Sequence, residues 1–131
     1  MITFTQQQSK IPKLMRPVYI VTAGVSKFDR AFPDKRTEEL CIDAFTMASD
    51  MLDMEPAELK GYIHTCYDGH CADHFGDQLL GEAVIHDRLG LDPLGNIGVK
   101  TGGATGGSTL WEAVKAVASG YSDCTLAMGW E

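Results

Sequence analysis

Hydrophobic and polar positions along this chain of 131 residues follow two different periodicities. Short apolar runs bounded by proline, glycine or charged residues are typical of strands that are covered on both faces. Longer segments carry an apolar residue every three or four positions, which is typical of helices with one buried face. Because the two kinds of segment alternate, the pattern predicts an α/β fold with a mostly parallel sheet flanked by helices.

The predicted elements follow the order βαβαβαβ. The pattern predicts strands over residues 18–23, 62–65, 96–99 and 124–128. It predicts helices that begin at residue 37, span 77–89 and span 106–119, and a connecting turn over 55–60. Since a sheet that ended at the last of these strands would be half-built, we expect further protein beside it, from the same chain or another subunit.

Local signals support the three helices. Thr37 is a suitable N-cap, and acidic residues in the first turn favour the positive end of the helix dipole. Apolar positions at helical spacing predict two buried faces: Cys41, Phe45, Ala48 and Leu52 in the first helix, and Leu110, Ala113, Val114 and Val117 in the third. Gly90 and Gly120 are placed to end the second and third helices in the left-handed conformation.

Charge and composition exclude several classes of protein. The chain has 11 basic and 18 acidic residues and no block of like charge, which disfavours nucleic-acid binding. It has no apolar run of the roughly 18–20 residues that a membrane span requires. Residues 1–16 form an N-terminal arm without the apolar core of a secretory signal. Four cysteines without such a signal indicate reduced thiols and a cytoplasmic protein.

Five segments resemble, in order and spacing, the N-terminal portion of the thiolase superfamily, in its archaeal and sterol-carrier-type branch. They are residues 23–28, 37–40, 89–91, 114–123 and 126–131, the last ending in Gly-Trp-Glu where the family usually has Gly-x-Glu. Thiolases pair two similar α/β halves. The resemblance therefore implies that residues 17–131 are a thiolase-like N-terminal α/β domain, incomplete relative to the family.

The resemblance also reveals a departure from the family pattern. The family's nucleophile is a cysteine on the turn that opens the third helix, where the helix N-terminus stabilises a thiolate that attacks an acyl-CoA carbonyl. In this chain Gly103 occupies that position, and shifting the alignment by one or two residues finds no cysteine. Glycine cannot be acylated, so the resemblance implies a degenerate nucleophile.

Some thiolase-like proteins are aldolases or partner subunits that use no acylated cysteine. Retro-aldol cleavage of a CoA thioester needs a base for the β-hydroxyl group and hydrogen-bond donors for the enolate. Gly102, Gly103, Ala104 and Gly106 could supply backbone amides as an oxyanion or thioester turn. The alternative is a tight turn that lets the helix and the sheet approach closely.

One segment gathers potential catalytic and metal-binding side chains. It holds three of the four histidines and two of the four cysteines: His64, Cys66, His70, Cys71 and His74. The three histidines are candidate catalytic residues. Sulfur and imidazole could together hold Zn²⁺, but the spacing matches no standard zinc pattern, so we expect no metal. The remaining alternative is a polar loop near a pocket or a subunit interface. His86, alone on its predicted helix, is expected to be a surface or packing residue.

Two functions are open on this basis. The chain is either part of a thiolase-like enzyme acting on a carbon–carbon bond of an acyl-CoA, as an acyltransferase or a lyase, or a non-catalytic thiolase-like scaffold. A coenzyme A thioester would be the substrate, with no covalently bound cofactor. The resemblance implies a homo-oligomer, and its partners could include a second thiolase-like segment in trans and a zinc-ribbon/OB-fold protein. A nucleotide-binding domain is disfavoured, because residues 102–107 contain no GxGxxG or Walker pattern.

Overall fold

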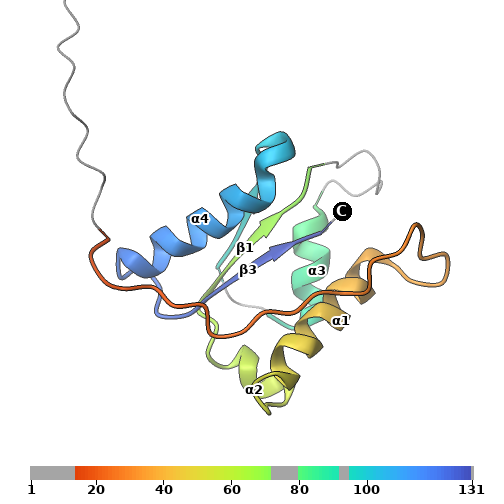
Figure 1. Cartoon of the computed structure of the whole chain (residues 1–131), viewed down its shortest axis with the longest axis horizontal. Helices are drawn as coiled ribbons and strands as arrows, with labels where there is room; N and C mark the ends of the chain where they lie inside the picture. Colours follow the sequence, from red (N-terminus) through yellow and green to blue (C-terminus); the bar gives the residue numbers. More distant parts are fainter. Residues whose placement is uncertain (1–13, 72–79, 92–94, 131) are drawn as a thin grey trace, which may run out of the picture.

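The computed structural model of the chain describes residues 14–71, 80–91 and 95–130. The elements, in chain order, are α1 (Thr37–Asp50), α2 (Pro56–Lys60), β1 (Thr65–Gly69), α3 (Gly81–Leu89), β2 (Gly95–Val99), the 3₁₀ turn η2 (Gly102–Ala104), α4 (Thr105–Ala118) and β3 (Thr125–Gly129). The three strands form a parallel sheet in the order β2-β1-β3 (Figure 1). The predicted α/β class with a parallel sheet flanked by helices is confirmed.

The sheet lies between two helical layers. Successive strand residues point to opposite faces, and Cys66 and Tyr67 of β1 accordingly belong to two different hydrophobic clusters. Cys66 packs in a cluster with residues of α1 and α3, whereas Tyr67 packs with Ala113 and Ala116 of α4. Helices α1 and α3 therefore cover one face and α4 covers the other (Figure 1).

The helix signals in the sequence are largely confirmed. Helix α1 begins at Thr37, but the N-cap is Arg36 rather than the predicted Thr37. The Glu39 carboxylate accepts a hydrogen bond from the Arg36 backbone N–H at 2.7 Å, which satisfies a donor at the helix start. Cys41, Phe45 and Ala48 are buried as predicted. Helix α3 ends at Gly90, whose φ of 65° and ψ of 42° are left-handed. No helix among residues 14–71, 80–91 and 95–130 is long and apolar enough to cross a membrane.

The strand predicted at residues 18–23 is wrong. This segment forms no strand, and its apolar side chains face solvent, with Tyr19 and Ile20 each 78% exposed. It runs instead from α4 to α1 (Figure 1): the Arg16 guanidinium donates hydrogen bonds to the Val117 and Ser122 carbonyls, and the Thr22 hydroxyl donates to Ala48 O at 2.7 Å.

The second strand lies later in the sequence than predicted. It spans Thr65–Gly69 rather than residues 62–65, and its residues pair with both neighbouring strands. The sequence did not indicate these bounds, because Cys66, Asp68 and Gly69 do not form an apolar run. Residues 55–60, predicted as a turn, contain the short helix α2, with Pro56 at its first position, where proline needs no hydrogen-bond partner.

Helix α4 buries a different face from the one predicted. Its buried residues are Thr105, Thr109, Ala113, Ala116 and Ala118. Of the predicted stripe, Ala113 is buried, Val114 and Val117 are half-buried, and Leu110 is exposed. Leu110 and Trp111 are 48% and 55% exposed. The small side chains on the buried face let the helix axis approach the sheet more closely than a face of leucine and valine would allow.

Candidate functional site

The carboxyl edge of the sheet gathers the residues that follow its three strands. His70 follows β1, Trp130 follows β3, and the turn from Gly102 to Gly107 lies between β2 and the first turn of α4. Carboxyl ends of parallel strands meet at one edge, which is the usual ligand site in open α/β sheets. This edge of the sheet is therefore the candidate functional site.

Threonine side chains hold the glycine-rich turn in place. The Thr105 hydroxyl donates to Gly102 O at 2.7 Å and accepts from the Thr101 backbone N–H at 3.0 Å. The Thr101 hydroxyl donates to Ser108 Oγ at 2.8 Å. Gly102 has a φ of 63°, a left-handed conformation that favours glycine. The turn is thus ordered by its own hydrogen bonds at the start of a 14-residue helix.

The glycines of this turn face open space. A Cβ atom added at Gly102, Gly103, Gly106 or Gly107 would meet no atom of the described chain within 4 Å. Close approach of helix and sheet therefore does not explain these glycines, and only Gly102 has a backbone conformation that demands one. Amides in the first turn of a helix have no partner within the helix. The turn presents such amides beside an unfilled surface, which suits an anionic or carbonyl oxygen.

Gly69, at the end of β1, is the glycine that the packing does require. A Cβ there would lie 2.2 Å from Thr109 Oγ1 and 3.0 Å from Thr105 Cγ2. Gly69→Ala should therefore push the first turns of α4 away from the sheet and lower the free energy of unfolding by about 1–3 kcal/mol. Urea titration followed by circular dichroism measures this effect. Gly106→Ala, on the open side of the same helix, is the control, and equal losses in both variants would contradict this packing.

His70 is held rigidly at the carboxyl edge. It is 2% exposed, and its ring stacks on that of Trp130 with centroids 4.1 Å apart and planes 17° from parallel. Its Nε2 atom lies 3.3 Å from Oε2 of Glu82 on α3. A carboxylate within hydrogen-bonding distance of an imidazole orients the ring. The arrangement is that of a positioned acid–base group, and the sequence pattern did not indicate Glu82 as its partner.

The histidine-cysteine segment does not form one cluster. His64 and His70 stand at opposite ends of β1, which separates them by about 20 Å at the usual rise of a strand. His64 Nδ1 accepts a hydrogen bond from the Asp123 backbone N–H at 3.4 Å, near the amino end of β3. Cys71 is exposed, and His74 lies outside the described residues. Of the predicted catalytic histidines, the structure places His70 at the carboxyl edge and His64 away from it.

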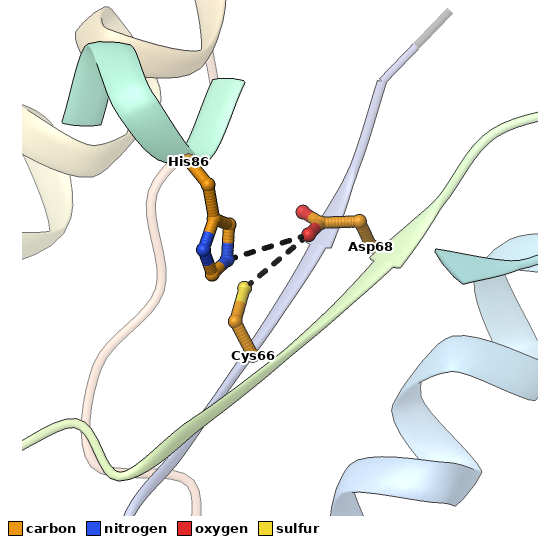
Figure 2. A group of neighbouring side chains, drawn as sticks. All are labelled: Cys66, Asp68 and His86. Atoms are coloured by element: carbon orange, nitrogen blue, oxygen red, sulfur yellow. Dashed lines mark hydrogen bonds and ion pairs between the residues drawn. The ribbon is translucent and has the colours of Figure 1, made fainter. Parts of the chain in front are cut away.

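A second group of polar side chains lies inside the protein between β1 and α3. Asp68 Oδ2 is 3.6 Å from Cys66 Sγ and 3.6 Å from His86 Nε2, and Figure 2 shows the thiol and the imidazole pointing toward the carboxylate. Cys66 and Asp68 are 0% exposed and His86 is 7% exposed. Cys66 and Asp68 face the same helix because they are two residues apart on one strand.

Burial sets the electrostatics of this group. The pKa of Asp68 is raised from 3.8 to about 7, with desolvation as the largest cause; the nearby Glu82 also raises it, while the Cys66 thiol and the Asn96 amide lower it. Desolvation likewise raises the pKa of the Cys66 thiol far above its ordinary value, with Asp68 as the next cause. Each group therefore resists ionisation unless a positive charge is nearby.

The sequence indicates Asp68 only as an alternative ligand within the histidine-cysteine segment, and it does not indicate His86 as its partner. His86 was expected to be a surface or packing residue, yet it lies on the buried stripe of α3 with Ile85 and Leu89. The spacing of these three residues was a usable signal, because it places the histidine on the helix face that meets the sheet. Asp68 gave no such signal, since a charged residue in a short segment is normally assigned to a loop.

Comparison with known proteins links this fold to sterol carrier proteins. No family model matches the chain. It is 28% identical over 127 residues to sterol carrier protein 2 of Homo sapiens, which covers 92% of this chain and 21% of the relative. It is 28% identical over 119 residues to sterol carrier protein 2 of Gallus gallus, covering 90% and 20%. The chain thus spans about a fifth of the length of these relatives, and the similarity supports the sterol-carrier part of the resemblance.

Proposed function

We propose that this chain is the N-terminal α/β part of a thiolase-like protein that holds an acyl-CoA thioester at the turn from Gly102 to Gly107. The observation that carries the proposal is the open space over these glycines, at the first turn of α4 and the carboxyl edge of the sheet. Packing explains a cluster of glycines only where a neighbour comes close, and here none of the described atoms does.

The chemistry follows from what the turn contains and lacks. Backbone amides at the first turn of α4 can stabilise the negative charge that develops on a thioester oxygen. Gly103, at the position of the family nucleophile, offers no atom for acyl transfer. The reaction that suits such a site is retro-aldol cleavage, in which a base removes the proton of a β-hydroxyl group, the Cα–Cβ bond breaks, and the thioester enolate takes the electron pair. Among the described residues, His70, which Glu82 orients, is the candidate for this base.

The oligomeric state and partners belong to the same proposal. A homo-oligomer, a second thiolase-like segment in trans, or a zinc-ribbon/OB-fold partner would each add protein beside the three-stranded sheet. Native mass spectrometry of the purified protein distinguishes them. A second polypeptide in the complex directs the search for further catalytic groups to that chain. A simple homo-oligomer without enzymatic activity favours the scaffold function.

Lipid carriage is the second candidate function. It is favoured by the name of the relatives and by a wide, open depression of about 610 Å³ beside α4, whose mainly apolar lining also includes Glu112 and Lys115. Its lining includes Leu14, Met15, Tyr67, Ala116 and Tyr121. A fluorescent sterol that binds the wild type and is excluded by Ala118→Trp, with acyl-CoA binding unchanged, would favour this function over the first.

Binding of an acyl-CoA analogue tests the principal proposal. The analogue carries a methylene group in place of the thioester sulfur, and calorimetry measures its Kd. Gly103→Val should raise this Kd by about tenfold or more, because a side chain fills the space that a carbonyl oxygen must enter. Gly95→Val, at the amino end of β2, is the matched control and should leave the Kd unchanged. Equal Kd values for the wild type and Gly103→Val would refute the site.

Restoring the thiol makes a complementary prediction. In a Cys71→Ser background, Gly103→Cys places a thiol in open space at the N-terminus of α4. The helix end should lower the thiol pKa, so that iodoacetamide modifies it about tenfold faster at pH 7 than a thiol introduced by Ser119→Cys at the other end of the helix. Intact mass after incubation with acyl-CoA should show a single added acyl group. Equal reactivity of the two thiols would contradict the predicted environment of position 103.

A further inference from the structure

We propose that Cys66, Asp68 and His86 form a zinc-binding site between β1 and α3, separate from the acyl-CoA turn. The set shares only Cys66 with the histidine-cysteine segment that the sequence singled out. Its other two members are Asp68, two residues further along β1, and His86 on α3, 18 residues beyond Asp68. The proposal does not depend on the function proposed above.

Two of the three distances between the ligand atoms match those of a tetrahedral zinc site. Zinc binds sulfur, nitrogen and oxygen ligands at about 2.0–2.3 Å, so neighbouring ligand atoms at tetrahedral angles stand about 3.4–3.6 Å apart. Asp68 Oδ2 is 3.6 Å from Cys66 Sγ and 3.6 Å from His86 Nε2, and the three ligand atoms lie within 4.8 Å of one another. Figure 2 shows the three side chains converging from β1 and α3.

Burial provides an independent reason for a cation. Asp68 is 0% exposed, and its Oδ1 atom accepts no hydrogen bond of normal geometry from any group that the structure describes. A buried carboxyl group without full hydrogen bonding is costly, and a bound cation is one of the few compensations available in a protein interior. Apart from the proposed ligands Cys66 and His86, the titratable neighbours are Cys41 on α1 and Glu82 on α3, neither of which supplies positive charge.

The scaffold around the three ligands is rigid. Cys66 and Asp68 lie on the central strand, whose backbone pairs with both β2 and β3. His86 is fixed by the packing of α3, in the same cluster of buried residues that contains Cys66, Ile85 and Leu89. A preorganised ligand set loses little conformational entropy when it binds a metal.

The ligand types select the metal. A thiolate and an imidazole favour zinc or cobalt over magnesium and calcium, which prefer oxygen ligands. Three protein ligands leave a fourth position for water. Because the thiol must lose its proton on binding, the affinity should rise with pH and binding should release protons.

Metal titration of the purified, chelator-treated chain tests the proposal. Competition with a chromophoric zinc chelator should give about one zinc per chain. Cobalt should give thiolate-to-metal charge-transfer absorption and the intense visible bands of a tetrahedral site. Cys66→Ser and His86→Gln should each weaken zinc binding by about tenfold or more. In the same titration, Cys71→Ser, which removes an exposed thiol, should bind zinc like the wild type.

Circular dichroism of each variant separates loss of ligand from loss of fold. If Cys66→Ser fails to fold, Asp68→Asn, which keeps the shape of the side chain, takes its place and should show the same loss of affinity. Absence of stoichiometric binding by the folded wild type overturns the proposal. Zinc binding that survives Cys66→Ser and disappears in Cys71→Ser also overturns it, because the metal would then sit on the surface thiol.

Discussion

Gly24→Ala should lower the free energy of unfolding by at least about 3 kcal/mol, or release the N-terminal segment from α1. A Cβ atom at position 24 would lie 1.9 Å from Ala44 O and 2.7 Å from Ala48 N. Both are backbone atoms of α1, so no side-chain rotation can relieve the collision. Urea denaturation measures the free energy, and limited proteolysis after Lys27 or Arg30 detects release of the segment.

Gly106→Ala is the matched control for this prediction. It adds the same methyl group within α4, where a Cβ meets nothing within 4 Å among the described residues. Alanine is the better helix former, so this variant should be unchanged or more stable by about 0.5–1 kcal/mol. If Gly24→Ala is as stable as the wild type and equally resistant to proteolysis, the segment does not pack on α1 as described.

Asp68→Asn should stabilise the metal-free protein above pH 7 and have no stabilising effect near pH 4. The folded-state pKa of Asp68 is raised from 3.8 to about 7. Between these values the folded protein retains a proton that the unfolded chain has lost, so the free energy of unfolding falls as the pH rises. The penalty is absent below pH 4 and complete above pH 7. We expect a gain of about 2 kcal/mol at pH 8, since asparagine keeps the shape without the charge.

The groups facing Asp68 decide how large this effect is. Glu82 raises its pKa, the Cys66 thiol lowers it, and burial keeps the Cys41 thiol protonated by raising its pKa to about 12. His86 is the facing base, and a protonated His86 would offset part of the penalty.

Urea titrations at pH 4, 6 and 8 in the presence of a chelator measure the effect. Asp87→Asn, an exposed carboxylate on α3, is the control. Destabilisation of Asp68→Asn at every pH would mean that a charged Asp68 is paired with a charged His86.

Zinc should reverse the sign of the Asp68→Asn effect at pH 8. A bound divalent cation stabilises the folded state in proportion to its affinity, and the asparagine variant loses a charged ligand. The same titrations with zinc in place of the chelator therefore connect the stability prediction to the proposed metal site.

The elements with strong local signals could be predicted from the sequence. Helix α1 begins at Thr37, α3 ends at Gly90, and β2 lies within one residue of its predicted bounds. The substitution of glycine for the nucleophile at position 103 was also visible, because it depends only on alignment with the family pattern. The candidate catalytic role of the histidines and the acyl-CoA substrate stay predictions.

The candidate sites were less accessible from sequence. The spacing of His64 and His70 indicated proximity, but a five-residue strand separates them. The Cys66, Asp68 and His86 group joins residues whose positions along the chain differ by up to 20, and only the packing of α3 against β1 brings them together. A sequence motif does not predict that these three side chains are close, because their separation depends on how α3 is rotated against β1.

The sequence by itself determined the α/β class, the helices with their glycine termini, and the absence of a thiol at position 103. These properties follow from local periodicity, capping and residue identity. Only the tertiary structure decided that residues 18–23 lie outside the sheet, that α4 buries its alanines and threonines, and that Asp68 meets His86 in the interior. Those outcomes depend on competition between distant segments for the same strand edge and helix face, and local sequence preferences do not encode the result of that competition.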